Sequence, residues 1–210
     1  MPRQYDIAAI WNPQFVNNII QVLVEALEAK ETFIQGHNRR VSEICLAIGS
    51  KMGMSQIELR DLYTGAMLHD IGKALGTTEE TLNKADPLNQ SEEIIMREHT
   101  FKAGLLVVGL ENLSHILPTI MYHHERWDGN GYPARLRDES IPLHARIVCV
   151  ADSFDAMISP RSYRPAMSRE EAIKELISEK EKHFDPDIVD ILIECLKENP
   201  HELNDFSYYF

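Results

Sequence analysis

The segment from Leu68 to Lys73, which reads LHDIGK, carries the strongest local sign of chemistry in the chain. It places an imidazole and a carboxylate, His69 and Asp70, among apolar residues, where burying them is costly unless something compensates their polarity. A divalent metal ion would compensate them. Taken alone, the pair is better explained by a helix end or by an ion pair with Lys73, so a metal site requires further donors.

Further imidazole and carboxylate groups are spread along the chain. The full set of seven candidate metal donors is His37, His69, Asp70, His99, His123, His124 and Asp152. The neighbours His123 and His124 project about 100° apart on a helix, so both reach one ion only at a helix end or from a groove. Nitrogen and oxygen donors in this number, without a cysteine, suit two octahedral ions that share a carboxylate. The composition favours iron or manganese over structural zinc.

The elements that must position these donors are predicted to be helices, because apolar residues recur three and four positions apart and no long stretch alternates like a strand. The fold class is therefore all-α. The predicted helices that carry donors run over Gly36–Met52, Ser55–Gly72, Ser91–Val108, Leu113–Glu125 with a kink at Pro118, and Leu143–Ile158. Two polar segments, Leu75–Gln90 and Trp127–Pro142, are predicted to be loops.

Length and composition bound the class of protein. The 210 residues show no composition break and predict one domain over residues 13–198, with an extension at 1–12, a tail at 199–210 and no sensory module. A net charge of −12 argues against binding a nucleic-acid polymer. No apolar run is long enough for membrane insertion and no secretory signal is recognisable, so a cytoplasmic location is expected. Cys45, Cys149 and Cys195 are expected to be buried thiols.

The order of the donors, together with the segments around them, resembles the HD-GYP family of HD-superfamily phosphohydrolases. The matching segments are LHDIGK, HHERWDGNGYP at 123–133, VADSFDAM at 150–157, RSYR at 161–164 and FDP at 184–186. The resemblance covers roughly Glu25 to Lys197. It implies a single HD-type helical bundle of about seven to nine helices that hydrolyses cyclic di-GMP to pGpG, with GMP after a second cut.

The resemblance also implies a role for each site residue. One metal ion would be held by His37, His69, Asp70 and Asp152, and the other by Asp70, His99, His123 and His124. Asp70 would bridge the ions and, with Lys73, serve catalysis, while a hydroxide between the ions attacks the phosphate. The predicted substrate contacts are Lys73, Tyr132, Arg161 and Arg164. Asp128 and Asp155 are expected to orient their neighbours rather than to bind metal.

Three departures from the family pattern bear on activity. Phe33 stands four residues before His37, where some relatives have a carboxylate for a third ion, so two ions are predicted. The segment from Ala74 to Thr81 and the alanine at Ala103 also differ, which leaves substrate access and turnover open. Two alternatives are an HD-type enzyme for another nucleotide and a weakly active signalling module. Such a module would bind cyclic di-GMP, or contact a diguanylate cyclase or receptor through the loop at 128–133.

Overall fold

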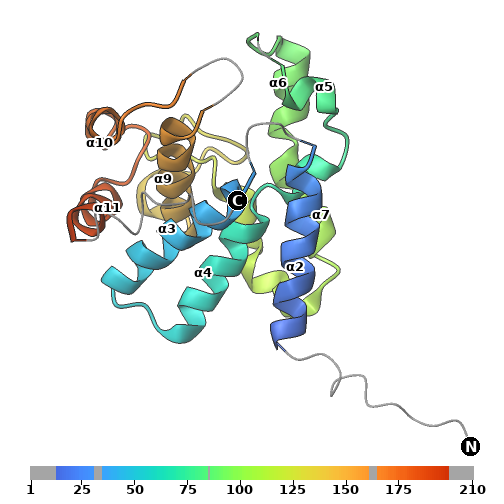
Figure 1. The fold of residues 1–210 in the computed structure, drawn as a ribbon, viewed down its shortest axis with the longest axis horizontal. Coiled ribbons are helices and arrows are strands. Elements are labelled where there is room, and N and C mark those ends of the chain that lie inside the picture. The colour runs from blue at the N-terminus through green and yellow to red at the C-terminus, as the bar shows by residue number, and fades with distance from the viewer. Residues whose placement is uncertain (1–12, 31–34, 85, 161–164, 199–210) are drawn as a thin grey trace, which may run out of the picture.

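The structure is a computed structural model that describes residues 13–30, 35–84, 86–160 and 165–198. Within these residues the chain forms helices and no strand, which confirms the all-α class (Figure 1). The α-helices are α2 (Pro13–Glu28), α3 (His37–Lys51), α4 (Gln56–Leu68), α5 (Glu79–Leu82), α6 (Gln90–Arg97), α7 (His99–Val107), α8 (Leu117–Tyr122), α9 (Leu143–Ile158), α10 (Arg169–Ser178) and α11 (Pro186–Glu198). Short 3-10 helices lie at Ile71–Ala74, Glu111–Ile116 and Asp138–Ser140.

Two clusters of buried apolar side chains hold the helices together. The larger cluster joins α3, α9, α10 and α11 and includes the fully buried Phe154 and Ile44. The smaller joins α2, α7 and α8 and includes Ile20 and Ile120. Helix α4 contributes Leu62 to the first cluster and Met67 and Leu68 to the second, and it lies between the two groups of helices in Figure 1. Helix α4, which ends just before His69, therefore packs against both clusters.

The helix predicted over Ser55–Gly72 begins as expected and ends earlier. Ser55 and Glu58 form the capping box that their spacing predicts. Helix α4 ends at Leu68, because Asp70 has φ −98° and ψ 1°, outside the α-helical region. His69 therefore caps the helix, and Lys73 follows in a 3-10 turn instead of on the same helical face.

Two other predicted helices are divided. The helix predicted over Ser91–Val108 is two helices, α6 and α7, which meet at Glu98. The helix predicted over Leu113–Glu125 begins as a 3-10 turn and becomes α8 only at Leu117. Pro118 lies in the first turn of α8, where a residue without an N–H group breaks no hydrogen bond, so it does not kink the helix.

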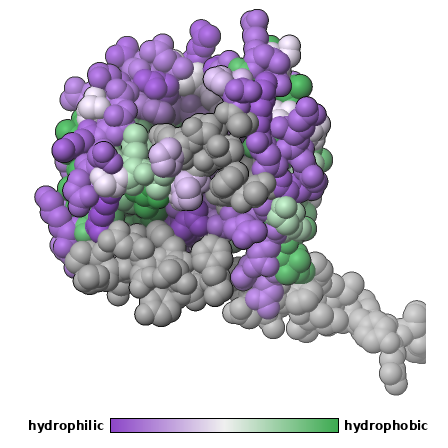
Figure 2. Space-filling model, turned by 45° about the horizontal axis from the view of Figure 1, so that its top comes forward, coloured by the Kyte–Doolittle hydropathy of each residue, from purple (hydrophilic) through white to green (hydrophobic). Residues whose placement is uncertain are grey.

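The remaining described residues agree with the predicted outline. The segment Leu75–Gln90 holds a single helical turn, and Trp127–Pro142 is a loop with only a short 3-10 turn. The three cysteines are buried and unpaired. None of the described helices is long and apolar enough to cross a membrane. The face shown in Figure 2 is mostly hydrophilic, with hydrophobic groups in small, separate areas.

Candidate metal centre

The predicted donors lie together in two adjoining groups. The first group is His37, His69 and Asp152, and the second is Asp70, His99, His123 and His124; within each group, ligand atoms lie within 4.8 Å of one another. They come from the start of α3, the end of α4, the start of α7, the end of α8 and the middle of α9. Five are buried, and His124 and Asp152 are half-buried. Segments far apart in the sequence thus converge on one centre.

Asp70 lies between the two groups and faces both. Its Oδ2 atom is 3.4 Å from Nε2 of His69, in the first group. Its Oδ1 atom is 3.4 Å from Nε2 of His99, in the second group. Lys73 approaches the same carboxylate, with Nζ 2.6 Å from Oδ2. One carboxylate that presents an oxygen to each group is the arrangement needed to join two cations.

Three of the histidines are oriented by the C-terminal ends of the helices that precede them. The carbonyl groups in the last turn of a helix lack partners within it. Nδ1 of His69 donates to the carbonyl of Ala66 at the end of α4, over 2.6 Å. His99 and His123 make the same bond, three residues back, with Met96 at the end of α6 and Ile120 near the end of α8. Each bond places the proton on Nδ1 and leaves the Nε2 lone pair facing the centre.

This orientation suits a bound cation. Nε2 of His99 is 3.4 Å from Nε2 of His123, so two lone pairs face each other once both Nδ1 atoms carry protons. Two adjacent nitrogen ligands of one ion, each about 2.1 Å from it, lie about 3 Å apart. The separation of the two Nε2 atoms is close to that distance. Nε2 of His69 is buried without a hydrogen-bond partner among the described groups. The residues present therefore fit a divalent metal site.

The electrostatics of the centre favour neutral imidazoles and ionised carboxylates. Burial, followed by neighbouring histidines, lowers the pKa of His123 and lowers that of His124 to about 3. Burial opposes ionisation of Asp70, but Lys73 and His69 outweigh it and hold its pKa well below the usual range. His69 and His37 differ. Burial lowers the pKa of His69, but the neighbouring Asp70 outweighs burial and raises it. Asp152 and Asp155 likewise outweigh the effect of burial at His37 and raise its pKa to about 10. A cation bound to His37 and Asp152 would replace that proton.

Asp155 fixes the orientation of His37, as expected for a residue that does not bind metal itself. Its Oδ2 atom is 2.8 Å from Nδ1 of His37. Arg40 donates to both carboxylate oxygens, from Nε over 2.6 Å and from Nη2 over 3.0 Å. Asp155 is fully buried, and burial raises its pKa, but His37 and then the paired Arg40 outweigh burial and lower the pKa, so the carboxylate stays ionised. Helix α9 thus provides both Asp152 for the centre and a support for His37.

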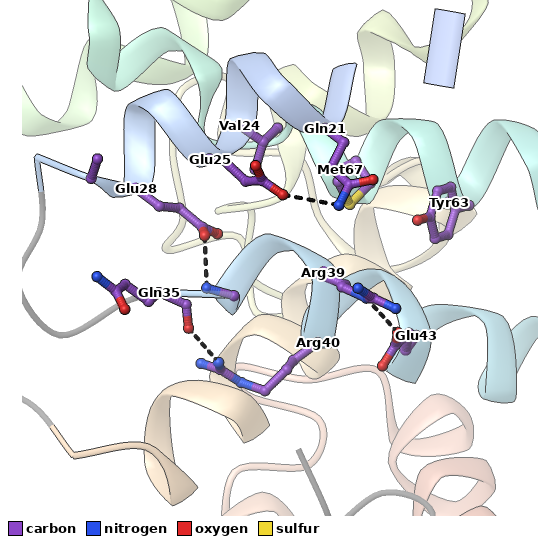
Figure 3. Close-up of a pocket in the computed structure, with 12 residues that line it drawn as sticks. Gln21, Val24, Glu25, Glu28, Gln35, Arg39, Arg40, Glu43, Tyr63 and Met67 are labelled. Carbon is purple, nitrogen blue, oxygen red and sulfur yellow. Dashed lines mark hydrogen bonds and ion pairs between the residues drawn. The ribbon is translucent and has the colours of Figure 1, made fainter. Parts of the chain in front are cut away.

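Glu28 fixes the start of α3, and sequence analysis missed it. Its buried carboxylate accepts hydrogen bonds from the backbone N–H groups of Gly36 and Asn38 and from the side chain of Asn38, over 2.7 to 2.9 Å. These contacts line a cavity of about 470 Å³ between α2 and α3, which Figure 3 shows together with Arg40. The sequence did carry a sign of this role, because Glu28 is an acidic residue at the end of one helix and precedes the glycine at which the next helix starts.

Gly72 permits the close contact between the His69–Asp70 segment and α7. A Cβ atom at this position would lie 1.9 Å from the carbonyl oxygen of His99 and 2.6 Å from the backbone nitrogen of Ala103. Only glycine allows the two backbones to approach this closely. Asp70 reaches His99 as a result.

The loop after α8 covers one side of the centre. The Tyr132 ring stacks on that of His124, with the centroids 4.8 Å apart, and the Arg97 guanidinium lies 5.0 Å from the Tyr132 centroid. Buried Glu125 holds the loop by accepting hydrogen bonds from the backbone N–H groups of Ala134 and Leu136. Asp128 orients the loop, as expected, by bonding Arg126 and the backbone of Asn130. The contact of Arg97 with Tyr132 was not predicted.

Three residues named in the predictions belong to segments that the structure does not describe. Arg161, Arg164 and Phe33 are outside the described residues, so their predicted roles stay predictions. His115 and His183 belong to neither donor group; His115 pairs with Asp61, and His183 stacks on Phe184.

An all-α domain that gathers imidazoles and carboxylates into two adjoining groups belongs to the class of helical domains that bind divalent metal ions. The model of the HD domain family matches residues 21–188, and the chain belongs to this family.

Comparison with known proteins refines this assignment. The chain is 36% identical over 188 residues to a protein of Thermotoga maritima named "Cyclic di-GMP phosphodiesterase", covering 88% of this chain and 50% of that protein. It is 33% identical over 178 residues to "3'3'-cGAMP-specific phosphodiesterase 2" of Vibrio cholerae, covering 84% of this chain and 34% of the relative. The chain thus spans half or less of the length of these relatives. They confirm the resemblance to HD-GYP proteins.

The fold is shared with solved structures. The crystal structure of a cyclic GMP-AMP-specific phosphodiesterase of Vibrio cholerae superposes with a TM-score of 0.70 at 24% sequence identity. The match covers 90% of this chain and 51% of that one. At this identity the likeness supports the HD fold alone.

Proposed function

We propose that this domain is a metal-dependent phosphodiesterase that hydrolyses cyclic di-GMP to linear pGpG, with GMP after a second cut. The observation that carries the proposal is the position of Asp70, whose two oxygens face the two donor groups at 3.4 Å each. Such a site suits phosphodiester hydrolysis because two neighbouring ions stabilise both the attacking and the leaving oxygen. The names of the relatives support a cyclic dinucleotide as the substrate.

The metal ligands of the proposal are the seven residues of the two groups, with Asp70 shared. Bound ions would act as Lewis acids on the phosphate and lower the pKa of a water molecule. Iron or manganese suits this set of imidazole and carboxylate donors better than an ion that prefers thiolate.

The chain's own residues would complete the site. Lys73, beside Asp70 and only 16% exposed, would donate to a phosphate oxygen and offset its developing charge. Tyr132 would form a wall against the substrate, and Arg161 and Arg164 would contact phosphate or guanine. A cytoplasmic location and a protein partner at the loop 128–133 remain predictions.

The experiment that tests the proposal combines metal analysis with a product assay. Protein purified without oxygen should contain about two equivalents of iron or manganese and convert cyclic di-GMP to pGpG. Asp70→Ala should lose both metal and activity, whereas Lys73→Ala should keep the metal and lose turnover. His115→Ala, outside both donor groups, is the control. Full activity in metal-stripped protein would refute the proposal, and faster turnover of another cyclic dinucleotide would correct the substrate.

A further inference from the structure

A groove of about 620 Å³ adjoins the metal centre and has no role so far. Its volume lies within the usual range of small-molecule sites. It runs along α6 and α7 and ends at Tyr132 and Pro133. The apolar side chains that line it are unusually open to solvent, with Ile94 56% exposed and Phe101 and Leu105 each 57% exposed. Apolar groups held open beside a catalytic centre suggest a place for a flat, apolar part of the substrate.

The groove is continuous with the metal centre through Tyr132. The ring of this residue stacks on the metal-site residue His124 and also lines the groove. Arg97 lies over the same ring, and Arg97 and Phe101 are each only two residues from His99. A ligand whose phosphate lies at the centre is therefore within reach of the groove.

The polar groups at the groove favour one base over others. Arg97 at the end of α6, Glu98 at the junction and Phe101 in α7 all line the groove. Guanine offers two acceptors, O6 and N7, that match the fork of an arginine. It also offers N–H donors that a carboxylate accepts. Adenine presents an amino donor in place of O6, and that donor would face the donors of Arg97.

We propose that this groove binds a guanine base of the substrate, stacked on Phe101, with Arg97 donating to O6 and N7 and Glu98 accepting from the N1 and N2 hydrogens. The proposal rests on the proposed function in taking the ligand to be a cyclic dinucleotide. It predicts that cyclic di-GMP and 3'3'-cGAMP, which both contain guanine, are bound, and that cyclic di-AMP is discriminated against.

The present partners of Arg97 and Glu98 do not prevent this. Arg97 pairs with Glu93 over 2.6 Å and Glu98 with Lys102 over 2.9 Å. Both pairs join residues one helical turn apart, and Arg97, Glu93 and Glu98 are each about half exposed, so the pairs contribute little net stability. A guanidinium also has five donors, and the bond to Glu93 engages Nη2. A base can therefore compete for these groups.

The test measures GMP and AMP binding to the metal-loaded full chain by calorimetry. The wild type should prefer GMP. Arg97→Ala should weaken GMP binding by about 5- to 150-fold and leave AMP nearly unaffected, and Arg97→Lys should lose most of the preference because the fork is gone. Phe101→Ala should weaken both nucleotides, because stacking tolerates any base.

Matched controls lie on other helices. Arg60→Ala removes another exposed arginine and Val22→Ala another exposed apolar residue, and neither should change nucleotide binding or metal content. An unchanged GMP-to-AMP ratio in Arg97→Ala would overturn the proposal. A second result would also overturn it: Phe101→Ala binds both nucleotides as the wild type does but sediments as a smaller oligomer than the wild type. The groove would then bind a second copy of the chain.

The two proposals fail in different ways. A wild type that prefers GMP through Arg97 but does not cleave cyclic di-GMP would refute the proposed function and support the groove. A wild type that cleaves cyclic di-GMP equally well with and without Arg97 would refute the groove alone.

Discussion

Removing the carboxylate of Asp155 should weaken one metal site more than the other. Asp155 contacts His37, at 2.8 Å, and its other hydrogen bonds within the described residues go to Arg40 and Ser159 rather than to the second donor group. Loss of such an outer hydrogen bond to a metal-binding histidine typically lowers metal affinity 10- to 100-fold. Asp155→Ala should therefore weaken the ion at His37, His69 and Asp152 by about 1.4–2.7 kcal/mol. The ion at His99, His123 and His124 should keep its affinity.

The same substitution should also destabilise the protein without metal. The side chain of Arg40 is 14% exposed, and it would lose its carboxylate partner. Breaking a buried ion pair from one side costs about 3–5 kcal/mol. The lower end applies here, because Arg40 also donates to the carbonyl of Gln35 and to the hydroxyl of Ser159. Urea unfolding of the apoprotein should show a loss of about 3 kcal/mol.

Metal titration of the apoprotein against a competing dye separates the two sites and measures the affinity directly. Asp190→Ala is the matched control, since it removes an exposed carboxylate that pairs with Lys180 at the surface. It should change stability by less than about 1 kcal/mol and leave both affinities unchanged. Equal affinities for both ions in Asp155→Ala and the wild type would refute the role of Asp155 in positioning His37.

Three further predictions follow from contacts around the centre. Removal of bound metal with a chelator should lower the unfolding free energy by about 2.7 kcal/mol, relative to protein with free metal at 100 times its Kd. A melting temperature that does not change with metal concentration would contradict a metal site in the folded state. Gly72→Ala should lower the unfolding free energy measured in urea by about 3 kcal/mol, the upper end of the range for overpacking, because the added Cβ would meet the His99 carbonyl. Gly109→Ala is the control, since a Cβ at Gly109 would meet open space. Glu28→Ala should cost at least about 1.5 kcal/mol, since it removes a charged acceptor from buried N–H groups, and Glu25→Ala, an exposed neighbour, should cost far less.

The sequence allowed the donors to be predicted because five of them, His69, Asp70, His123, His124 and Asp152, stand in short motifs with recognisable neighbours, and the order of all seven along the chain resembles one family. Helix starts were equally local, as the capping box of Ser55 and Glu58 shows. The supports of the site were not local. Asp155 lies 118 residues from His37, and the approach of Gly72 to α7 depends on where two separate helices pack. Periodicity within one helix carries no information on such distances, which is why α4 was predicted to continue through Gly72.

The early end of α4 is itself part of how the centre is built. A helix continued to Gly72 would use the carbonyl of Ala66 for its own ladder, and His69 could not bond it. Helices α4, α6 and α8 instead stop within two residues of a histidine, and each histidine bonds a carbonyl in the last turn of the helix before it. The C-terminal ends of these helices carry partial negative charge and meet at the centre, where they favour bound cations. The same local event therefore ends a helix, fixes the imidazole that would bind metal and adds to the potential that attracts it.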